Sequence, residues 1–371
     1  MIPFLLMLLA VGVAAELYSL RHALDGVEYD LRFSKPVAEP DEPLQLITVV
    51  TNRRRRFLPF LRVRQNVPSA LVTEKPLYIE NYTEDRRQLQ NTLYLMPRQR
   101  LTRRATVSLP ARGCWRFGDA LLFGGDFLGL GERATVYPIR RELVVLPRAA
   151  SDVPVDRLLG GYLGETSVNR FILEDPILTL GFREYTGREP MKQIAWAQSA
   201  RMGQLMVRRQ DFTVERTATV VFNVDTFLFG SYAEGLVETC CALARSVCEA
   251  LETRRIPYAF LSNAACESRP EGFGQAGDGL GEAHLRGILE GLGRANYERW
   301  ESLDALLARA SAKAALGRLH IFITPSAREL DHPGLARLRQ TSGQPVLTLA
   351  ADAWRPANGE TPVDAGREGR S

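Results

Sequence analysis

The hydrophobic pattern between residues 27 and 147 is that of short β-strands. Runs rich in Val, Ile, Thr and Tyr alternate with Pro, Asn, Gly and charged residues; they read VEYDLRF, LQLITVVTN, FLRVRQNV, ATVSLP and ATVYPI. Regularly spaced strands without intervening helices predict an immunoglobulin-like β-sandwich domain over residues 26–147. The run Arg53–Arg56 lies between two of these strands and predicts a hairpin tip, which is either a solvated turn or a contact for anionic lipid headgroups.

The period of the pattern changes at Ala218. Continuous apolar runs at 218–225, 258–263, 320–325 and 346–350 predict strands that a parallel sheet buries on both faces. Apolar positions at helical spacing lie between these runs and predict four helices. The first covers 231–254, the second starts near His284, the third carries Leu303, Leu306 and Leu307, and the fourth carries Leu335 and Leu338. Alternating strands and helices predict a doubly wound α/β domain over 218–354. The polar stretch 355–371 predicts a flexible tail.

The N-terminus begins with an uncharged apolar run, Ile2 to Ala15. These residues would rise about 21 Å as a helix, and extension to Leu20 brings the length near 30 Å. Because Arg21 and His22 follow the run, the positive-inside rule predicts an uncleaved anchor helix over 1–25. This anchor helix would make the chain a single-pass protein of the cell membrane, in contact with membrane lipid, with most of its residues in the cytoplasm. A cleaved signal peptide is the alternative, although the charged segment that usually opens one is missing.

Composition narrows the function classes. The net charge is +4, from 47 basic and 43 acidic residues, and this near balance argues against a nucleic-acid partner. The five cysteines include no CxxC pair, so we expect buried thiols in a reducing compartment rather than disulfides or a metal site. The motifs GxxxxGK[ST], HExxH and GxSxG are absent from the sequence. A GxGxxG at 272–277 does not directly follow a strand, which favours a flexible linker over a dinucleotide site.

The connector over 148–217 carries a motif string. Its elements are Arg183-x-Tyr185, Lys192, Ile194-x-Trp196, Ser199-Ala200-Arg201 and Leu205-x-Val207-Arg208. In this string the chain resembles the family known as domain of unknown function 58. The resemblance extends to Arg112-Gly113, to the turn over 126–130 and to Val136-Tyr137-Pro138.

The resemblance implies a fold and a set of partners. It implies a von Willebrand factor A-like α/β domain after the β-domain, and a MoxR-type AAA+ ATPase as partner, possibly alongside a transglutaminase-like membrane protein. Such α/β domains can hold a divalent cation through Asp-x-Ser-x-Ser after the first strand. Here Asp225 is in place but Phe227 and Phe229 replace both serines, so we predict a degenerate site without metal or other cofactor.

Six residues of the connector are candidates for partner binding or interdomain packing: Arg183, Tyr185, Lys192, Trp196, Arg201 and Arg208. Trp, Tyr and Arg dominate binding hot spots, which favours a partner surface. The alternative is packing between domains, with Trp196 buried and the arginines paired to acids.

The sequence therefore predicts a multi-domain α+β protein that is a non-enzymatic adaptor or scaffold, working with a MoxR-type ATPase at the cytoplasmic face of the membrane. An exported adhesion or envelope-binding module is one alternative. An unrecognised enzyme is the other.

Overall fold

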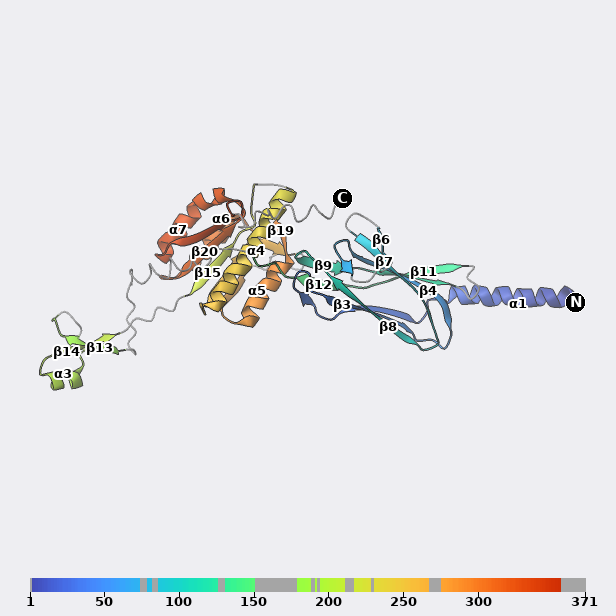
Figure 1. Ribbon diagram of the computed structural model, residues 1–371, viewed down its shortest axis with the longest axis horizontal. Helices are drawn as coiled ribbons and strands as arrows, with labels where there is room; N and C mark the ends of the chain where they lie inside the picture. Colours follow the sequence, from blue (N-terminus) through green and yellow to red (C-terminus); the bar gives the residue numbers. More distant parts are fainter. Residues whose placement is uncertain are drawn as a thin grey trace. The chain divides into compact units, whose positions relative to one another are not determined.

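The structure is a computed structural model, and it has a mixed α+β fold (Figure 1). It describes residues 2–73, 79–81, 86–125, 131–150, 179–187, 191, 194–210, 217–227, 230–266 and 275–354. The chain divides into two compact units. The first comprises Met1–Ala149, Ala264–Phe273 and Arg286–Trp300, and the second comprises Ala150–Asn263, Gly274–Leu285 and Glu301–Ser371. The α/β domain predicted as one piece over 218–354 thus contributes two stretches to the first unit.

Two antiparallel sheets form most of the first unit. One has the order β1 (Val27–Phe33), β3 (Leu44–Asn52), β8 (Arg100–Ser108), β5 (Val72–Thr73). The other has the order β11 (Glu132–Tyr137), β10 (Ala120–Gly125), β4 (Leu58–Pro68), β7 (Arg86–Leu95), β6 (Ile79–Asn81). A third sheet joins β2 (Val37–Ala38), β12 (Arg141–Val145) and β9 (Gly113–Phe117).

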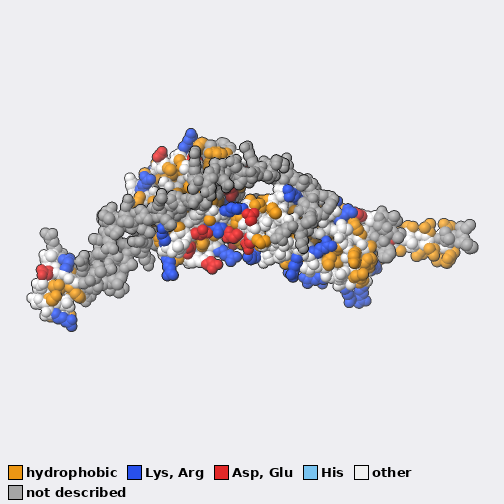
Figure 2. Space-filling view, in the orientation of Figure 1, with side chains coloured by type: hydrophobic (Ala, Val, Ile, Leu, Met, Phe, Trp, Pro, Cys, Tyr) orange, Lys and Arg blue, Asp and Glu red, His pale blue; other side chains and the backbone are white. Residues whose placement is uncertain are grey.

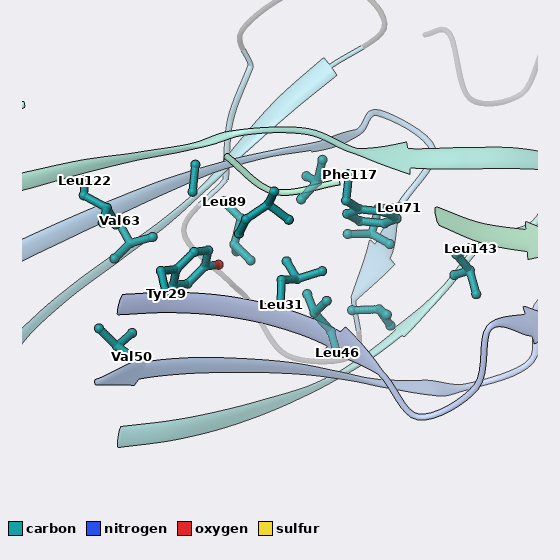
Figure 3. Close-up of a cluster of buried hydrophobic side chains, with 14 of the residues drawn as sticks. Tyr29, Leu31, Leu46, Val50, Val63, Leu71, Leu89, Phe117, Leu122 and Leu143 are labelled. Carbon is teal, nitrogen blue, oxygen red and sulfur yellow. The ribbon is translucent and has the colours of Figure 1, made fainter. Parts of the chain in front are cut away.

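The core of the first unit lies between these layers. Along β1, Tyr29 and Leu31 are buried while the residues between them are more exposed, as expected of a strand with one face inward. Figure 3 shows Tyr29 and Leu31 meeting Val63 and Leu89 of the opposite layer. Full burial of each large aliphatic side chain contributes about 1.5–3 kcal/mol. This β-rich arrangement is compatible with the predicted sandwich.

The Arg53–Arg56 segment is not a hairpin tip, which corrects the sequence prediction. Strand β3 pairs with β1 and β8, whereas β4 pairs with β10 and β7, so the segment crosses from one sheet to the other. Asn52 holds the crossover: its buried amide donates to the carbonyls of Arg56 at 2.8 Å and Met96 at 3.1 Å. A period-2 pattern identifies strands but not their partners.

The predicted membrane anchor is also wrong. Residues Ile2–Arg21 form helix α1. None of the helices in the described part of the chain combines the length and the apolar composition that spanning a membrane requires. The physical reason is that the uncharged run before Glu16 rises only about 21 Å, which is short of a hydrocarbon core of about 30 Å. The predicted localisation, a single-pass protein of the cell membrane, is therefore wrong as well.

Two segments distant in sequence complete the first unit. Strand β19 (Ala295–Arg299) pairs with β17 (Ala264–Cys266), and helix α5 (Glu282–Arg294) precedes β19. The buried Arg112 side chain donates from Nη1 to the carbonyls of Leu292 and Ala295 at the C-terminus of α5. Terminal carbonyls of a helix lack partners within it, so Arg112 caps α5.

A five-stranded sheet is the centre of the second unit. Its order is β18 (Gln275–Gly279), β16 (Tyr258–Ser262), β15 (Ala218–Phe222), β20 (Leu319–Thr324), β21 (Val346–Ala350). All neighbours are parallel except β18, which is antiparallel at the edge. Residues 275–277 of the predicted linker therefore belong to strand β18, because an edge strand of small residues pairs through its backbone and has no apolar signature.

Helices cover this sheet. Helices α6 (Leu303–Ala312) and α7 (Pro333–Ser342) pack on the face that carries Val221, Leu261 and Phe322. Val220 and Phe222 point to the opposite face because side chains alternate along a strand, and they too are fully buried. Helix α4 (Ser231–Thr253) contacts the same strands and buries one long stripe of its own. That stripe includes Cys240, Cys241 and Cys248, and all five cysteines are free thiols.

Candidate functional site

The motif string of the connector forms a small hydrogen-bonded body, which we call the signature hairpin. Strand β13 (Thr179–Glu184) pairs antiparallel with β14 (Met206–Gln210), and helix α3 (Trp196–Met202) lies between them in sequence. Ile194, Ala195, Met206 and Val207 are buried. The backbone N–H of Ala195 donates to the Met206 carbonyl at 2.8 Å, which joins the start of α3 to β14.

Ser199 fixes the position of α3. Its buried hydroxyl donates to the Ala195 carbonyl at 3.0 Å and accepts from the Met206 backbone N–H at 2.8 Å. The helix ends at Gly203, whose φ of 69° lies in the left-handed region that glycine adopts without strain. Every element of the hairpin is thus held by contacts within it.

The surface of the signature hairpin is unusually apolar. Five large apolar side chains are exposed there: Phe182, Met191, Trp196, Met202 and Leu205. Trp196 is 60% exposed, and the exposed Arg201 lies in the last turn of the same helix. In Figure 2, hydrophobic side chains gather over α3, β13 and β14 next to basic ones. Contiguous exposed apolar patches on proteins mark interaction sites.

The structure brings five of the six predicted connector residues into this body, one of which, Arg208, is paired through its backbone with Phe182. Arg183 lies exposed on β13, and Tyr185 follows that strand, where its backbone N–H donates to the Leu205 carbonyl at 2.8 Å. Trp196 and Arg201 are the first residue and a last-turn residue of α3. Lys192 and the Arg208 side chain lie outside the described residues. Trp196 is not covered by the elements of the hairpin itself, and both partner binding and interdomain packing stay predictions for these residues.

A second cluster of polar groups lies at the carboxyl edge of the parallel sheet. Asn223 follows β15 and Asn263 follows β16, and both are fully buried. The Asn263 amide donates to Asn223 Oδ1 at 2.7 Å. The Asn223 amide donates to Thr324 Oγ1 at 3.0 Å and to Glu329 Oε2 at 2.8 Å. These hydrogen bonds connect the carboxyl ends of β15, β16 and β20, the edge of the sheet at which many α/β proteins bind their ligands.

Asp225 belongs to this edge and is positioned by Asn223. Its backbone N–H donates to Asn223 Oδ1 at 2.9 Å, and its carbonyl accepts from the Asn223 amide at 3.0 Å. The pKa of Glu329 is raised to about 8, mainly by burial, against the lowering effect of the hydrogen bond from Asn223 and with a smaller raising effect from the charges of Asp225 and Asp352. A partly buried carboxyl group that stays protonated near neutral pH is a hydrogen-bond donor as well as an acceptor.

The geometry around Asp225 differs from a cation site. The Arg328 guanidinium lies 4.6 Å from the centre of the Phe227 ring, so a positive side chain stands beside the first replaced serine position. Phe229 lies outside the described residues. Within the described ranges, no three His, Cys, Asp or Glu side chains are grouped to hold a metal ion.

Sequence reasoning missed Asn223, Asn263 and Glu329. The first two could have been found, because each is a polar residue directly after an apolar strand, and the carboxyl ends of adjacent parallel strands meet at one edge. Glu329 lies in the short 3-10 helix Ala327–Asp331, and no sequence pattern connects it to Asn223.

Comparisons with known proteins leave the family open. No family model matches the chain, and no curated protein matches it. The sporulation control protein Spo0M from Bacillus subtilis is 12% identical, over 43% of this chain and 58% of that one, with a TM-score of 0.20. A cohesin module of a family 33 glycoside hydrolase from Clostridium perfringens is 9% identical, over 32% of this chain and 96% of that one, with a TM-score of 0.23. A β-glucosidase from Erythrobacter marinus has a TM-score of 0.17, at 11% identity over 32% of this chain and 15% of that one.

These likenesses are too low to support any conclusion about fold or activity. The chain covers less than two thirds of Spo0M, the first of these structures. The resemblance to the domain of unknown function 58 family therefore stays a prediction.

Proposed function

We propose that this protein is a non-enzymatic adaptor whose signature hairpin binds a MoxR-type AAA+ ATPase. The partner follows from the family resemblance of the motif string, and a transglutaminase-like protein would be a further member of the same assembly. The proposal includes the finer fold: an immunoglobulin-like sandwich in the first unit and a von Willebrand factor A-like domain in the second. Two facing antiparallel sheets and a parallel sheet with helices on both faces support those two assignments.

The exposure of Trp196 supports the proposal most. An indole that is 60% exposed contributes little to the stability of its own unit and offers a large apolar area to a partner. Arg201 on the same helix can add charge-assisted hydrogen bonds around that area. Trp and Arg together are the residue types that carry most binding energy at protein interfaces.

The fixed backbone of the hairpin also favours binding. Ser199 and the backbone N–H of Ala195 hold α3 against β14, and the backbone N–H of Tyr185 joins the end of β13 to Leu205. Because these bonds fix the hairpin, little conformational entropy is lost when a partner is bound. The apolar patch is therefore pre-organised.

A binding assay with purified full-length chain and the MoxR-type ATPase of the same genome tests the proposal. Trp196→Ala should weaken binding by about 2 kcal/mol or more, roughly 30-fold, as expected for a hot-spot residue. Tyr232→Ala is the matched control, because Tyr232 is a 50% exposed aromatic residue on α4 and should leave binding unchanged.

The arginines provide a second arm of this assay. Arg201→Ala should weaken binding and reduce its salt dependence, while the melting temperature stays at the wild-type value. Full-strength binding by the folded Trp196→Ala, Arg183→Ala, Arg201→Ala and Arg208→Ala variants would contradict the proposed role of the hairpin.

A further inference from the structure

An arginine-lined groove runs beside the edge strand β1 of the first unit. Its volume is about 740 Å³. Side chains on the outer face of β1, β3 and β8 line its base, and the segment 137–141 lines its other side. Five arginines line it: Arg32, Arg53, Arg100, Arg140 and Arg141. Only two carboxylates, Glu28 and Asp30, lie among them, so the groove carries an excess of positive charge.

The strand register explains why these side chains share one face. Glu28 pairs with Thr51, and Thr51 pairs with Arg100, so the three side chains form a row across the sheet. The small side chains of Val49 and Thr51 leave room above β3, and the longer arginines rise around it. The groove is therefore a consequence of alternation on the outer face of an antiparallel sheet.

The groove already binds one carboxylate of its own in the way a ligand would be bound. Asp30 accepts hydrogen bonds from Arg32 Nε at 2.5 Å and from Arg141 Nη2 at 2.9 Å. Burial acts to raise the pKa of Asp30, but the hydrogen bonds from Arg141 and Arg32 leave it below its ordinary value. Arg141 also donates from Nε to the Leu31 carbonyl at 2.9 Å, which fixes its guanidinium against β1.

Two arginines keep their charge available for a ligand. Among the residues that the structure describes, neither Arg100 nor Arg140 forms an ion pair, and both are exposed. Arg32, Arg53 and Arg141, in contrast, are engaged with Asp30 and Glu28. Ligand carboxylates would thus meet Arg100 on one side of the groove and Arg140 on the other.

We infer that this groove binds an acidic peptide segment of a partner protein, with Arg100 and Arg140 as its main ligands. A peptide is favoured over a nucleic acid because the chain as a whole is nearly balanced in charge, whereas nucleic-acid-binding proteins usually carry a large, clustered basic excess. An extended segment of about seven residues, roughly 23 Å long, matches the seven residues of β1. The site is separate from the signature hairpin and does not depend on the function proposed for it.

The test measures binding of a fluorescent peptide of alternating Asp and Glu, about ten residues long, to the full chain at low salt. The same peptide with Asn and Gln in place of the acids is the ligand control. Arg100→Gln/Arg140→Gln should weaken binding about fivefold to tenfold, the range expected of two exposed charge pairs. Arg337→Gln/Arg339→Gln removes the same charge from the exposed surface of α7 and should leave binding within about twofold.

A lysine variant separates bidentate recognition from net charge. Arg100→Lys/Arg140→Lys keeps both charges but loses the planar fork, so it should bind more weakly than the wild-type chain and more tightly than the glutamine variant. Four results would overturn the inference: no binding of the acidic peptide, equal binding of the Asn/Gln peptide, equal loss in the α7 control, or tighter binding of a single-stranded oligonucleotide or anionic vesicles than of the acidic peptide.

Discussion

Gly293 is a position in α5 where one added methyl group should be costly. A Cβ built there would lie 2.8 Å from Val144 Cγ1 and 2.8 Å from the Val145 carbonyl oxygen. The carbonyl oxygen belongs to strand β12 and cannot rotate away, so either the helix or the strand must shift. Overpacking of this kind costs about 1–3 kcal/mol. The replacement of glycine by alanine inside a helix offsets part of that cost, by about 0.8–1.0 kcal/mol.

Gly287 supplies the matched control because it lies in the same helix with nothing within 4 Å of its built Cβ. Gly287→Ala should therefore stabilise α5 by about 0.8–1.0 kcal/mol. The two variants should differ by the overpacking cost alone, about 1–3 kcal/mol.

The measurement is native-state hydrogen exchange of the full chain, followed at the amides of β12 and α5. It is preferred to a global unfolding curve because a chain of two units need not unfold in one step. Gly293→Ala should reduce protection in both elements, and Gly287→Ala should increase it in α5. Equal gains in protection for the two variants would refute the close approach of α5 to β12.

Three further outcomes are expected at the carboxyl edge of the parallel sheet. Because the folded-state pKa of Glu329, about 8, lies above the ordinary 4.5, its protonated form stabilises the fold below pH 4.5, and this contribution is lost as pH rises through 8. Glu329→Gln should thus match the wild-type urea midpoint at about pH 4 and exceed it at about pH 9; identical pH profiles would contradict the shift. Asn223→Ala leaves buried polar groups without a partner, among them the Asn263 amide, and each should lower the free energy of unfolding by about 1–3 kcal/mol. No change in urea unfolding would show that water replaces the Asn223 side chain. Millimolar Mg²⁺ should leave the melting temperature unchanged, whereas a clear rise would show a cation bound near Asp225.

The strands and helices of the second unit could be predicted because their signals are local. Four continuous apolar runs became β15, β16, β20 and β21, and the long helical stripe became α4. Burial on both faces leaves a strand without polar positions, and this pattern is visible in the residues of that strand alone. The order of the sheet and its antiparallel edge depend on pairing between distant residues, which no single run encodes.

Other features escaped sequence reasoning for specific physical reasons. The sequence left Trp196 open between partner binding and interdomain packing, because the exposure of a side chain depends on what packs nearby and not on its neighbours in sequence. The crossover at Arg53–Arg56 was mistaken for a hairpin because strands adjacent in sequence usually pair. The polar cluster around Asn223 needed three strand ends brought to one place, so only its individual residues were visible in the sequence.

The non-contiguous composition of the first unit has a consequence for biosynthesis. Helix α5 and strand β19, whose carbonyls Arg112 binds, leave the ribosome about 150 residues after Ala149. At 5–20 residues per second this delay is roughly 8–30 s, far longer than a sheet of this size needs to collapse. During that interval the nascent first unit exposes the surface around Val144 and Arg112 that α5 later covers. We therefore expect chaperones to engage the growing chain there, and a chain truncated before Arg286 to remain bound to them.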